Sequence, residues 1–245
     1  MKRLVALHGF TGRGGDYDRL ADELPGEIKV VAPDWPGHGA KGGLRDKDAY
    51  SLAGHLRVID AAAEDGPIDL LGYSMGGRIA LHWALANPAR VSRLILIGAS
   101  PGLRSPSERD ERTAADSALA EFIRTRGTDA FIRYWHTQTM FRTLLSMQDE
   151  STRTIVAGRH RNDAEGLALS LEHVGTGALP SLWERLPELR MPVDLVTGSE
   201  DAKFCAIART MTTLMPRARY GEVDGAGHAV HLERAGDLAA VILRR

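Results

Sequence analysis

The chain of 245 residues contains a single cysteine, Cys205. This scarcity excludes an internal disulfide and a metal site built from several cysteines. Long apolar runs are also missing, since none approaches the roughly 18 residues that a membrane-spanning helix needs. The apolar run near the start, Leu4–Leu7, is too short for the core of a signal peptide. We therefore expect a protein of the reducing cytoplasm that has no membrane partner.

An excess of charge of one sign is lacking as well. The chain has 31 Lys and Arg residues against 32 Asp and Glu residues, for a formal net charge of -1. Nucleic-acid-binding domains usually carry a basic excess, so we expect no nucleic-acid partner. A hydrophobic content of 43% is ordinary for a globular protein, and the length is ample for a core without disulfides or metals.

Short apolar runs alternate with amphipathic stretches along most of the chain. The runs that end at Gly, Pro or Asp are typical of buried strands, and they are Leu4–Leu7, Ile28–Ala32, Ile68–Leu71, Leu94–Ile97, Val193–Thr197 and Arg219–Val223. The stretches with helical spacing between them are Asp16–Leu24, Leu52–Glu64, Gly77–Asn87, Ala206–Leu214 and Ala235–Leu243. This alternation predicts an α/β fold, with a mostly parallel sheet flanked by helices.

The middle of the chain breaks this rhythm. Residues 101–187 contain charged and aromatic helical patterns, such as "TDAFIRYWHTQTMFRTLLSM", and no convincing strand. We interpret them as a helical lid inserted in an α/β core formed by residues 1–100 and 188–245. None of these patterns indicates an oligomeric state.

A serine lies between glycines in "GYSMG", residues 72–76. Gly-x-Ser-x-Gly between a strand and a helix is the nucleophile elbow, in which a sharp turn lifts the serine hydroxyl out of the sheet. The helix that follows also points its first amides at the site. The alternative is a glycine-rich turn with an incidental serine. The strand–turn–helix context favours Ser74 as a nucleophile or base.

A serine hydroxyl is a weak nucleophile or base at neutral pH, so it needs an imidazole to accept its proton. The imidazole in turn needs a carboxylate that fixes its tautomer. In this kind of fold the acid and then the histidine follow the serine along the chain. We choose His228, in a glycine-rich loop, over His231, which lies at a helix start where capping or packing is expected. Asp201 follows the fifth predicted strand, and we interpret the adjacent Glu200 as a solvated loop charge. The predicted triad is Ser74, Asp201 and His228.

An oxyanion hole should accompany this triad. It uses the amide of the residue after the nucleophile, here Met75, and an amide from the loop after an early strand. The loop "LHGFTGRGG" supplies the second amide at Phe10. We assign a structural role to His38 in "DWPGHG" and a packing role to Cys205.

Together these residues resemble the α/β-hydrolase fold over essentially the whole chain. The segments "LHGFTG", "LLGYSMGGR", "SPGL" followed by "ERDER", "GSEDAKF" and "GAGHAVHLE" are similar to one family within it, the 2-succinyl-6-hydroxy-2,4-cyclohexadiene-1-carboxylate synthases of menaquinone biosynthesis. The most discriminating are Arg78, the "SPGL…ERDER" segment, and Lys203-Phe204 after the acid. Because the chain begins almost directly at the first predicted strand, we expect preceding strands common in this fold to be absent or reduced.

The resemblance implies a tricarboxylate substrate, a cyclohexene ring with three carboxylates. It also implies a reaction in which Ser74, deprotonated through His228, removes a proton beside the succinyl ketone, and pyruvate is expelled without a metal or organic cofactor. Arginine suits such a substrate because it makes bidentate, permanently charged contacts with carboxylates. By family pattern the residues around the substrate are Tyr73, Arg78, Arg112 (with Arg109 as a substitute), Trp135, Arg161 and Lys203.

Two other functions fit parts of the pattern. A carboxylesterase or carbon–carbon bond hydrolase would use the same triad on a neutral substrate, but it has little use for the arginines. A non-catalytic receptor or interaction module of this fold often lacks a triad member, and this chain has all three. The charged run "ERDERTAAD" can also be interpreted as a solvated helix face with i,i+3 and i,i+4 ion pairs.

Overall fold

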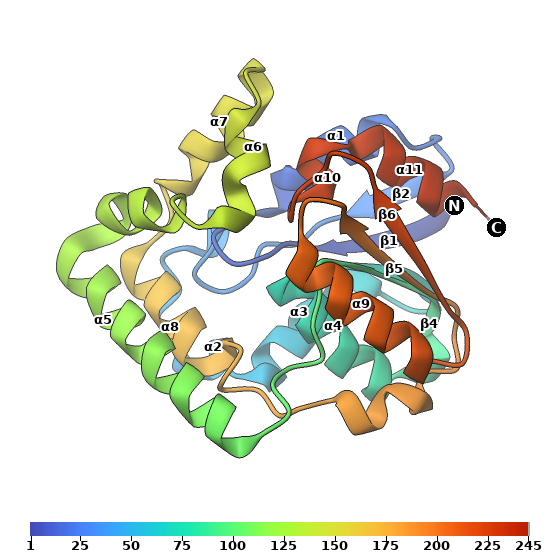
Figure 1. The fold of residues 1–245 in the computed structure, drawn as a ribbon, viewed down its shortest axis with the longest axis horizontal. Helices are drawn as coiled ribbons and strands as arrows, with labels where there is room; N and C mark the ends of the chain where they lie inside the picture. Colours follow the sequence, from blue (N-terminus) through green and yellow to red (C-terminus); the bar gives the residue numbers. More distant parts are fainter. Residues whose placement is uncertain (245) are drawn as a thin grey trace.

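The computed structural model describes residues 1–244, and its parallel sheet lies between helices on its two faces (Figure 1). The sheet has six strands. The strands are ordered β2-β1-β3-β4-β5-β6, with every neighbouring pair parallel. All six predicted strands are present. Their bounds are β1 (Lys2–Leu7), β2 (Ile28–Val31), β3 (Ile68–Tyr73), β4 (Val91–Ile97), β5 (Val193–Gly198) and β6 (Ala218–Val223).

Alternate residues of the strands face opposite sides of the sheet. Val5 and Leu7 of β1 pack into one apolar cluster and Leu4 and Ala6 into the other, as the two-residue period of a strand requires. The helices on the Val5 side are α3 (Leu52–Ala63), α4 (Met75–Ala86) and α9 (Ala202–Leu214). Those on the Leu4 side are η1 (Gly14–Tyr17), α1 (Asp18–Asp22), α10 (Val230–Glu233) and α11 (Ala235–Leu243).

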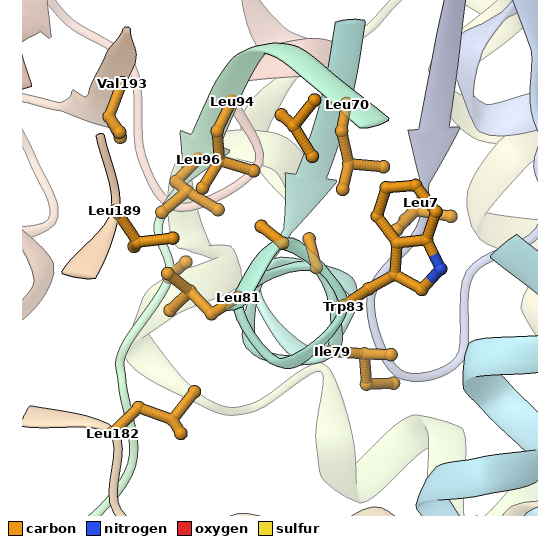
Figure 2. Packing of buried hydrophobic residues seen from close by; sticks show 14 of the residues in the cluster. Leu7, Leu70, Ile79, Leu81, Trp83, Leu94, Leu96, Leu182, Leu189 and Val193 are labelled. Atoms are coloured by element: carbon orange, nitrogen blue, oxygen red, sulfur yellow. The ribbon is translucent and has the colours of Figure 1, made fainter. Parts of the chain in front are cut away.

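Helix α4 is buried on nearly all sides. Ile79, Leu81 and Trp83 leave its axis in different directions, and strand and loop leucines lie above and beside the helix (Figure 2). A helix with apolar side chains on most of its surface is stable inside a core. The start of α4, where Ser74 lies, is therefore fixed by the packing of the whole helix.

In the described chain, all regular secondary structure between β4 and β5 is helical. We call α5 to α8 the cap helices; in Figure 1, α5 runs alongside α8, while α6 and α7 stand apart from them. Apolar side chains of α5 and α8 form a third cluster that includes Ile123, Phe131 and Leu167. The bounds are α5 (Pro106–Trp135, broken at Gly127), η4 (Thr139–Phe141), α6 (Arg142–Ser146), α7 (Glu150–Arg159), α8 (Ala164–Val174) and η5 (Trp183–Glu188).

The remaining short helices were not predicted from the sequence. They are η2 (Gly39–Lys41), α2 (Lys47–Tyr50), η3 (Pro88–Arg90) and α10. The predicted helix Asp16–Leu24 is divided into η1 and α1, and α9 begins at Ala202, directly after Asp201. None of the helices within residues 1–244 is both long and apolar enough to cross a membrane.

Candidate active site

Ser74 occupies a strained turn between β3 and α4. Its backbone has φ 52° and ψ -111°, and its amide donates a hydrogen bond to the Ile97 carbonyl at 2.9 Å. A positive φ is unfavourable for serine and persists only where the surrounding structure enforces it. A Cβ atom on Gly72 would lie 2.6 Å from the Gly77 Cα, which explains the glycine before the serine. This geometry is that of a nucleophile elbow.

Gly76 allows the elbow to lie against β1, and an alanine there is expected to destabilise the fold. Its Cβ would lie 2.3 Å from the Leu7 carbonyl oxygen, a backbone atom that cannot move aside cheaply. We expect Gly76→Ala to lower the free energy of unfolding by about 1–3 kcal/mol, the usual cost of overpacking. Urea denaturation measures this. The control is Gly26→Ala, because nothing lies within 4 Å of its Cβ position; equal losses in both variants would contradict the explanation.

A chain of hydrogen bonds joins Ser74, His228 and Asp201. The distance from Ser74 Oγ to His228 Nε2 is 3.0 Å, and His228 Nδ1 lies 2.6 Å from Asp201 Oδ2. The three side chains follow β3, β5 and β6, whose carboxyl ends meet at one edge of the sheet. Because the His228 ring is 1% exposed, this contact is shielded from water. The arrangement can transfer a proton from the hydroxyl to the imidazole.

The two rival residues lie elsewhere. His231 is fully buried, with its ring 4.3 Å from that of Tyr73 and 5.0 Å from that of Tyr17. Within residues 1–244 neither of its ring nitrogens has a hydrogen-bond partner, and burial lowers its pKa well below the usual value. Glu200 is exposed and pairs with Arg142 at 3.2 Å. Neither His231 nor Glu200 forms a hydrogen bond with the Ser74 hydroxyl.

The amides of Phe10 and Met75 are available at the same place. Both residues line a cavity together with Ser74, and neither amide donates to a backbone acceptor within the described chain. Met75 is the first residue of α4, where an amide has no acceptor within the helix. The two amides could together stabilise a negative oxygen held beside Ser74.

The loop that carries Phe10 is anchored by His8. The Trp35 amide donates to His8 Nε2 at 3.2 Å, so Nδ1 carries the proton and donates to the Gly9 carbonyl at 2.8 Å. Burial lowers the pKa of His8 to about 3 and keeps the ring neutral. Sequence reasoning assigned His8 no role of its own beyond its place in the loop "LHGFTGRGG".

The cavity beside Ser74 has a volume of about 1000 Å³ and lies between the sheet edge and the cap helices. This is the upper end of the range for small-molecule sites. Tyr73 and Arg161 are not among its lining residues. The predicted site residues that do line it are Phe10, Ser74, Met75, Arg78, Arg112, Trp135 and Lys203.

Arg78 is a buried cation in this cavity. It is 8% exposed, and its Nη2 donates to the Val174 carbonyl at 3.1 Å. Its Nε has no partner within residues 1–244. Burial, with a contribution from Arg112, lowers the pKa of Arg78 to about 10. A guanidinium has five donors, and within residues 1–244 the bond from Nη2 to the Val174 carbonyl is the only hydrogen bond that those of Arg78 make.

Arg112 lies nearby and pairs with a buried acid. Its Nε is 2.8 Å from Asp116 Oδ1 in an i,i+4 ion pair, of the kind predicted for a charged helix face. Asp116 lines the cavity and is 4% exposed, and its Oδ2 has no partner in the described chain. The four-residue spacing was the only sequence signal for Asp116. Arg109 instead donates to the Leu103 and Arg104 carbonyls and does not line the cavity.

Aromatic rings form much of the remaining wall. Trp135 stacks on Phe131, with ring centroids 5.6 Å apart, and meets Phe10 edge-on at 5.7 Å. Phe204, which sequence reasoning noted only as part of a motif, lies 4.5 Å from the His228 ring. Lys203 is exposed at the same wall. These rings make the cavity largely apolar around its few charged groups.

Tyr73 and Arg161 are placed apart from this cavity. The Tyr73 ring is 5% exposed and packs between the rings of His228 and His231, where it supports His228. Arg161 is exposed and lines a second, smaller cavity. The buried arginine of this segment is Arg159, which sequence reasoning missed. Its spacing of four residues from Ile155 and seven from Thr152, which places the three on one helical face, was the available signal.

Cys205 and His38 are both buried. Cys205 donates to the Gly198 carbonyl at 3.3 Å, and His38 Nδ1 lies 3.0 Å from the Pro36 carbonyl. Burial lowers the pKa of His38 to about 3. Both residues have internal partners, in keeping with the structural roles expected for them. Within residues 1–244, no group of three His, Cys, Asp or Glu side chains is arranged to hold a metal ion.

Comparison with known proteins identifies the family of this chain. The model of the alpha/beta hydrolase family matches residues 4–241. A protein from Bacillus subtilis named putative 2-succinyl-6-hydroxy-2,4-cyclohexadiene-1-carboxylate synthase is 38% identical over 94% of this chain and 85% of its own length. A Klebsiella pneumoniae synthase of that name is 32% identical over 98% of this chain and 91% of its own length.

Solved structures show the same relationship. The structure of MenH from S. aureus superposes with a TM-score of 0.90 and 31% identity, covering 99% of this chain and 92% of that one. An esterase from Thermogutta terrifontis reaches a TM-score of 0.79 at 24% identity, with 99% and 88% covered, which shows the shared fold alone. The chain therefore belongs to the 2-succinyl-6-hydroxy-2,4-cyclohexadiene-1-carboxylate synthase family within the alpha/beta hydrolases.

Proposed function

We propose that the chain is a lyase that eliminates pyruvate from 2-succinyl-5-enolpyruvyl-6-hydroxy-3-cyclohexene-1-carboxylate to form 2-succinyl-6-hydroxy-2,4-cyclohexadiene-1-carboxylate. The names of its relatives support this reaction. The observation that carries the proposal is the buried guanidinium of Arg78, with donors free to bind an anion, in the same cavity as Ser74.

The substrate explains why charge is placed there. It has three carboxylates, and a carboxylate offers Arg78 the bidentate, charge-assisted hydrogen bonds that it lacks. The guanidinium of Arg112, whose Nε pairs with Asp116, would offer a carboxylate its remaining donors. Burying a cation without a partner is unfavourable. A neutral ester would leave that cost uncompensated, whereas a polyanionic substrate offsets it when it binds.

In this mechanism Ser74 acts as a base and forms no acyl-enzyme. His228 accepts the hydroxyl proton, and Asp201 holds the ring by Nδ1 and stabilises the resulting imidazolium. Ser74 Oγ then removes the proton from ring carbon 2, beside the succinyl ketone. Charge that develops on the ketone oxygen is stabilised by the amides of Phe10 and Met75.

The electrons of the broken C–H bond complete the elimination. They form the double bond between carbons 2 and 3, while the existing double bond moves to carbons 4 and 5. The bond from carbon 5 to the ether oxygen breaks, and the enolpyruvyl group leaves, takes up a proton and becomes pyruvate. Ser74 keeps the proton taken from carbon 2, so His228, still protonated, returns to its neutral form by giving its proton to the departing enolpyruvate, directly or through water, which completes the cycle.

The reaction is tested with the purified chain and its proposed substrate. We expect pyruvate to be released well above the spontaneous rate, in step with the ultraviolet absorbance of a conjugated diene. A chelator should leave the rate unchanged, because no step in this mechanism uses a metal. Pyruvate release at the spontaneous rate, together with efficient cleavage of simple esters, would overturn the proposal in favour of a carboxylesterase.

A further inference from the structure

A second cavity lies behind the loop that carries Phe10. Its volume is about 110 Å³, well below the roughly 300–1,000 Å³ of pockets that hold drug-sized molecules. It shares no lining residue with the Ser74 cavity. Its lining residues are Thr11, Arg13, Asp16, Gly39, Ile155, Gly158, Arg159, Arg161 and Asn162.

Three arginines line this small cavity, and none of them forms an ion pair within the described residues, although the Arg159 guanidinium lies over the Phe141 ring at 5.5 Å. Arg13, Arg159 and Arg161 have no carboxylate within 4.0 Å in residues 1–244. Arg159 is 4% exposed, and its Nε and Nη1 are buried without a hydrogen-bond partner. Leaving a buried guanidinium in this state is unfavourable. The cavity therefore lacks a negative partner.

Polar groups of the neighbouring loop complete the lining. Thr11 is 1% exposed, and its hydroxyl has no partner within the described residues. The Thr11 backbone has φ 67°, and its carbonyl accepts a hydrogen bond from Asn162 Nδ2 at 2.8 Å. The residues after α7 and the loop after β1 are thus in contact here. The hydroxyl of Thr11 and guanidinium donors of Arg159 have no acceptor within the described residues.

Asp16 is the one acid among these lining residues, and it does not neutralise them. Its Oδ2 accepts from the Arg13 amide at 3.3 Å, and burial raises its pKa to about 6. Even with Asp16 ionised, the three guanidiniums leave the cavity with an excess of positive charge. A small anion would offset this excess.

We propose that this second cavity is a binding site for a small oxyanion, of the class of phosphate, sulfate or a carboxylate group, held by Arg13, Arg159 and Arg161. Guanidinium groups bind such anions through bidentate charge-assisted hydrogen bonds. The bound oxyanion would tie the end of α7 to the loop that carries Phe10. This site is separate from the elimination proposed above and does not depend on it.

Thermal unfolding tests the site at constant ionic strength. Phosphate, sulfate and acetate are titrated separately against potassium chloride, and their order of effect identifies the oxyanion class. We expect at least one of them to raise the Tm by a few degrees in a saturable way, because a ligand that binds only the folded state stabilises it. Arg159→Gln should weaken this binding about tenfold or more.

Matched variants separate this site from general effects of charge. Arg153→Gln removes an exposed arginine of the same helix and should keep the Tm response. Arg112→Gln, in the large cavity, should keep it too. Asp16→Asn should tighten binding several-fold, whereas Arg161→Gln should weaken it, so these two test the proposal even if Arg159→Gln fails to fold.

Three results would overturn the proposal. One is the absence of any saturable Tm rise beyond that in chloride. Another is a Tm response to the oxyanion that stays the same as in the wild-type chain in Arg159→Gln, or that stays the same in both Asp16→Asn and Arg161→Gln. The third is a response lost in Arg112→Gln, which would place the anion in the Ser74 cavity.

Discussion

Replacing Ser74 with alanine is expected to lower the rate of pyruvate elimination by about 10³-fold or more, and His228→Ala should do the same. Residues of a triad act as a unit, so losing either the hydroxyl or the imidazole removes several kcal/mol of transition-state stabilisation. The hydrogen bonds of 3.0 Å and 2.6 Å that join Ser74, His228 and Asp201 are the structural basis. Steady-state pyruvate release measures the loss.

Two further variants test the assignment of the acid. Asp201→Asn should reduce turnover strongly while the Tm changes little, because the amide can occupy the same space but favours the wrong imidazole tautomer. Glu200→Gln is the matched control, since Glu200 precedes Asp201 and is exposed. Equal losses in the two variants would contradict the choice of Asp201.

Labelling with a serine-directed phosphonate tests whether Ser74 is activated at all. The wild-type chain should be modified at Ser74, and His228→Ala should react far more slowly, because the hydroxyl then has no base. A non-catalytic protein of this fold would remain unlabelled. This experiment is independent of the substrate, so it remains informative even if the proposed elimination is wrong.

The sheet was predictable because its strands carry local signals. Buried parallel strands are continuous apolar runs, and Leu94–Ile97 and Val193–Thr197 stand out against the polar segments around them. The ends of strands were less predictable. β4 begins at Val91 because it pairs with β3 from Ile68 onward, and such pairing depends on the neighbouring strand and not on the local pattern.

The elbow was predictable for a similar reason. Gly72 and Gly76 are required by close backbone contacts, and such contacts leave glycines at fixed spacing in the sequence. The choice of His228 over His231 rested on a glycine-rich loop, and the structure places only the His228 ring in hydrogen-bond contact with Ser74. Its catalytic role stays a prediction until the variants are measured.

The cap helices were the least predictable part. Their helical character followed from spacing, but which arginine faces which cavity depends on how α5 and α7 are rotated. Arg112 lines the large cavity, whereas Arg161, chosen by resemblance, lines the small one. The helical face that includes Thr152 and Ile155 buries Arg159. Rotation of these helices is set by tertiary packing, which the motif alone does not specify.

Arg78 connects the stability of the chain to its proposed substrate. Burial lowers its pKa to about 10, so the unfolded state binds this proton more tightly than the folded state does. At every pH below about 10 the folded state therefore bears the full free-energy cost of burying the charged guanidinium. This cost decreases only as the pH rises above that value and Arg78 loses its proton. At neutral pH the folded chain is less stable because Arg78 is charged.

Arg78→Gln is expected to reduce activity and raise stability together. The variant removes the buried charge and keeps a side-chain donor for the Val174 carbonyl, so the free energy of unfolding should rise by about 1–3 kcal/mol at neutral pH. Elimination of pyruvate should lose ~2–5 kcal/mol of binding, roughly 30- to 5,000-fold in kcat/KM. Hydrolysis of a small neutral ester should barely change.

Arg57→Gln, which removes an exposed arginine from helix α3, is the control for Arg78→Gln and should leave all three measurements close to those of the wild-type chain. A plain esterase would gain stability from Arg78→Gln and lose nothing, so selection for function would not retain the arginine. A chain that uses Arg78 to hold a carboxylate loses its substrate as it gains stability. Equal losses on the anionic and neutral substrates would instead mean that Arg78 supports the shape of the site and does not recognise charge.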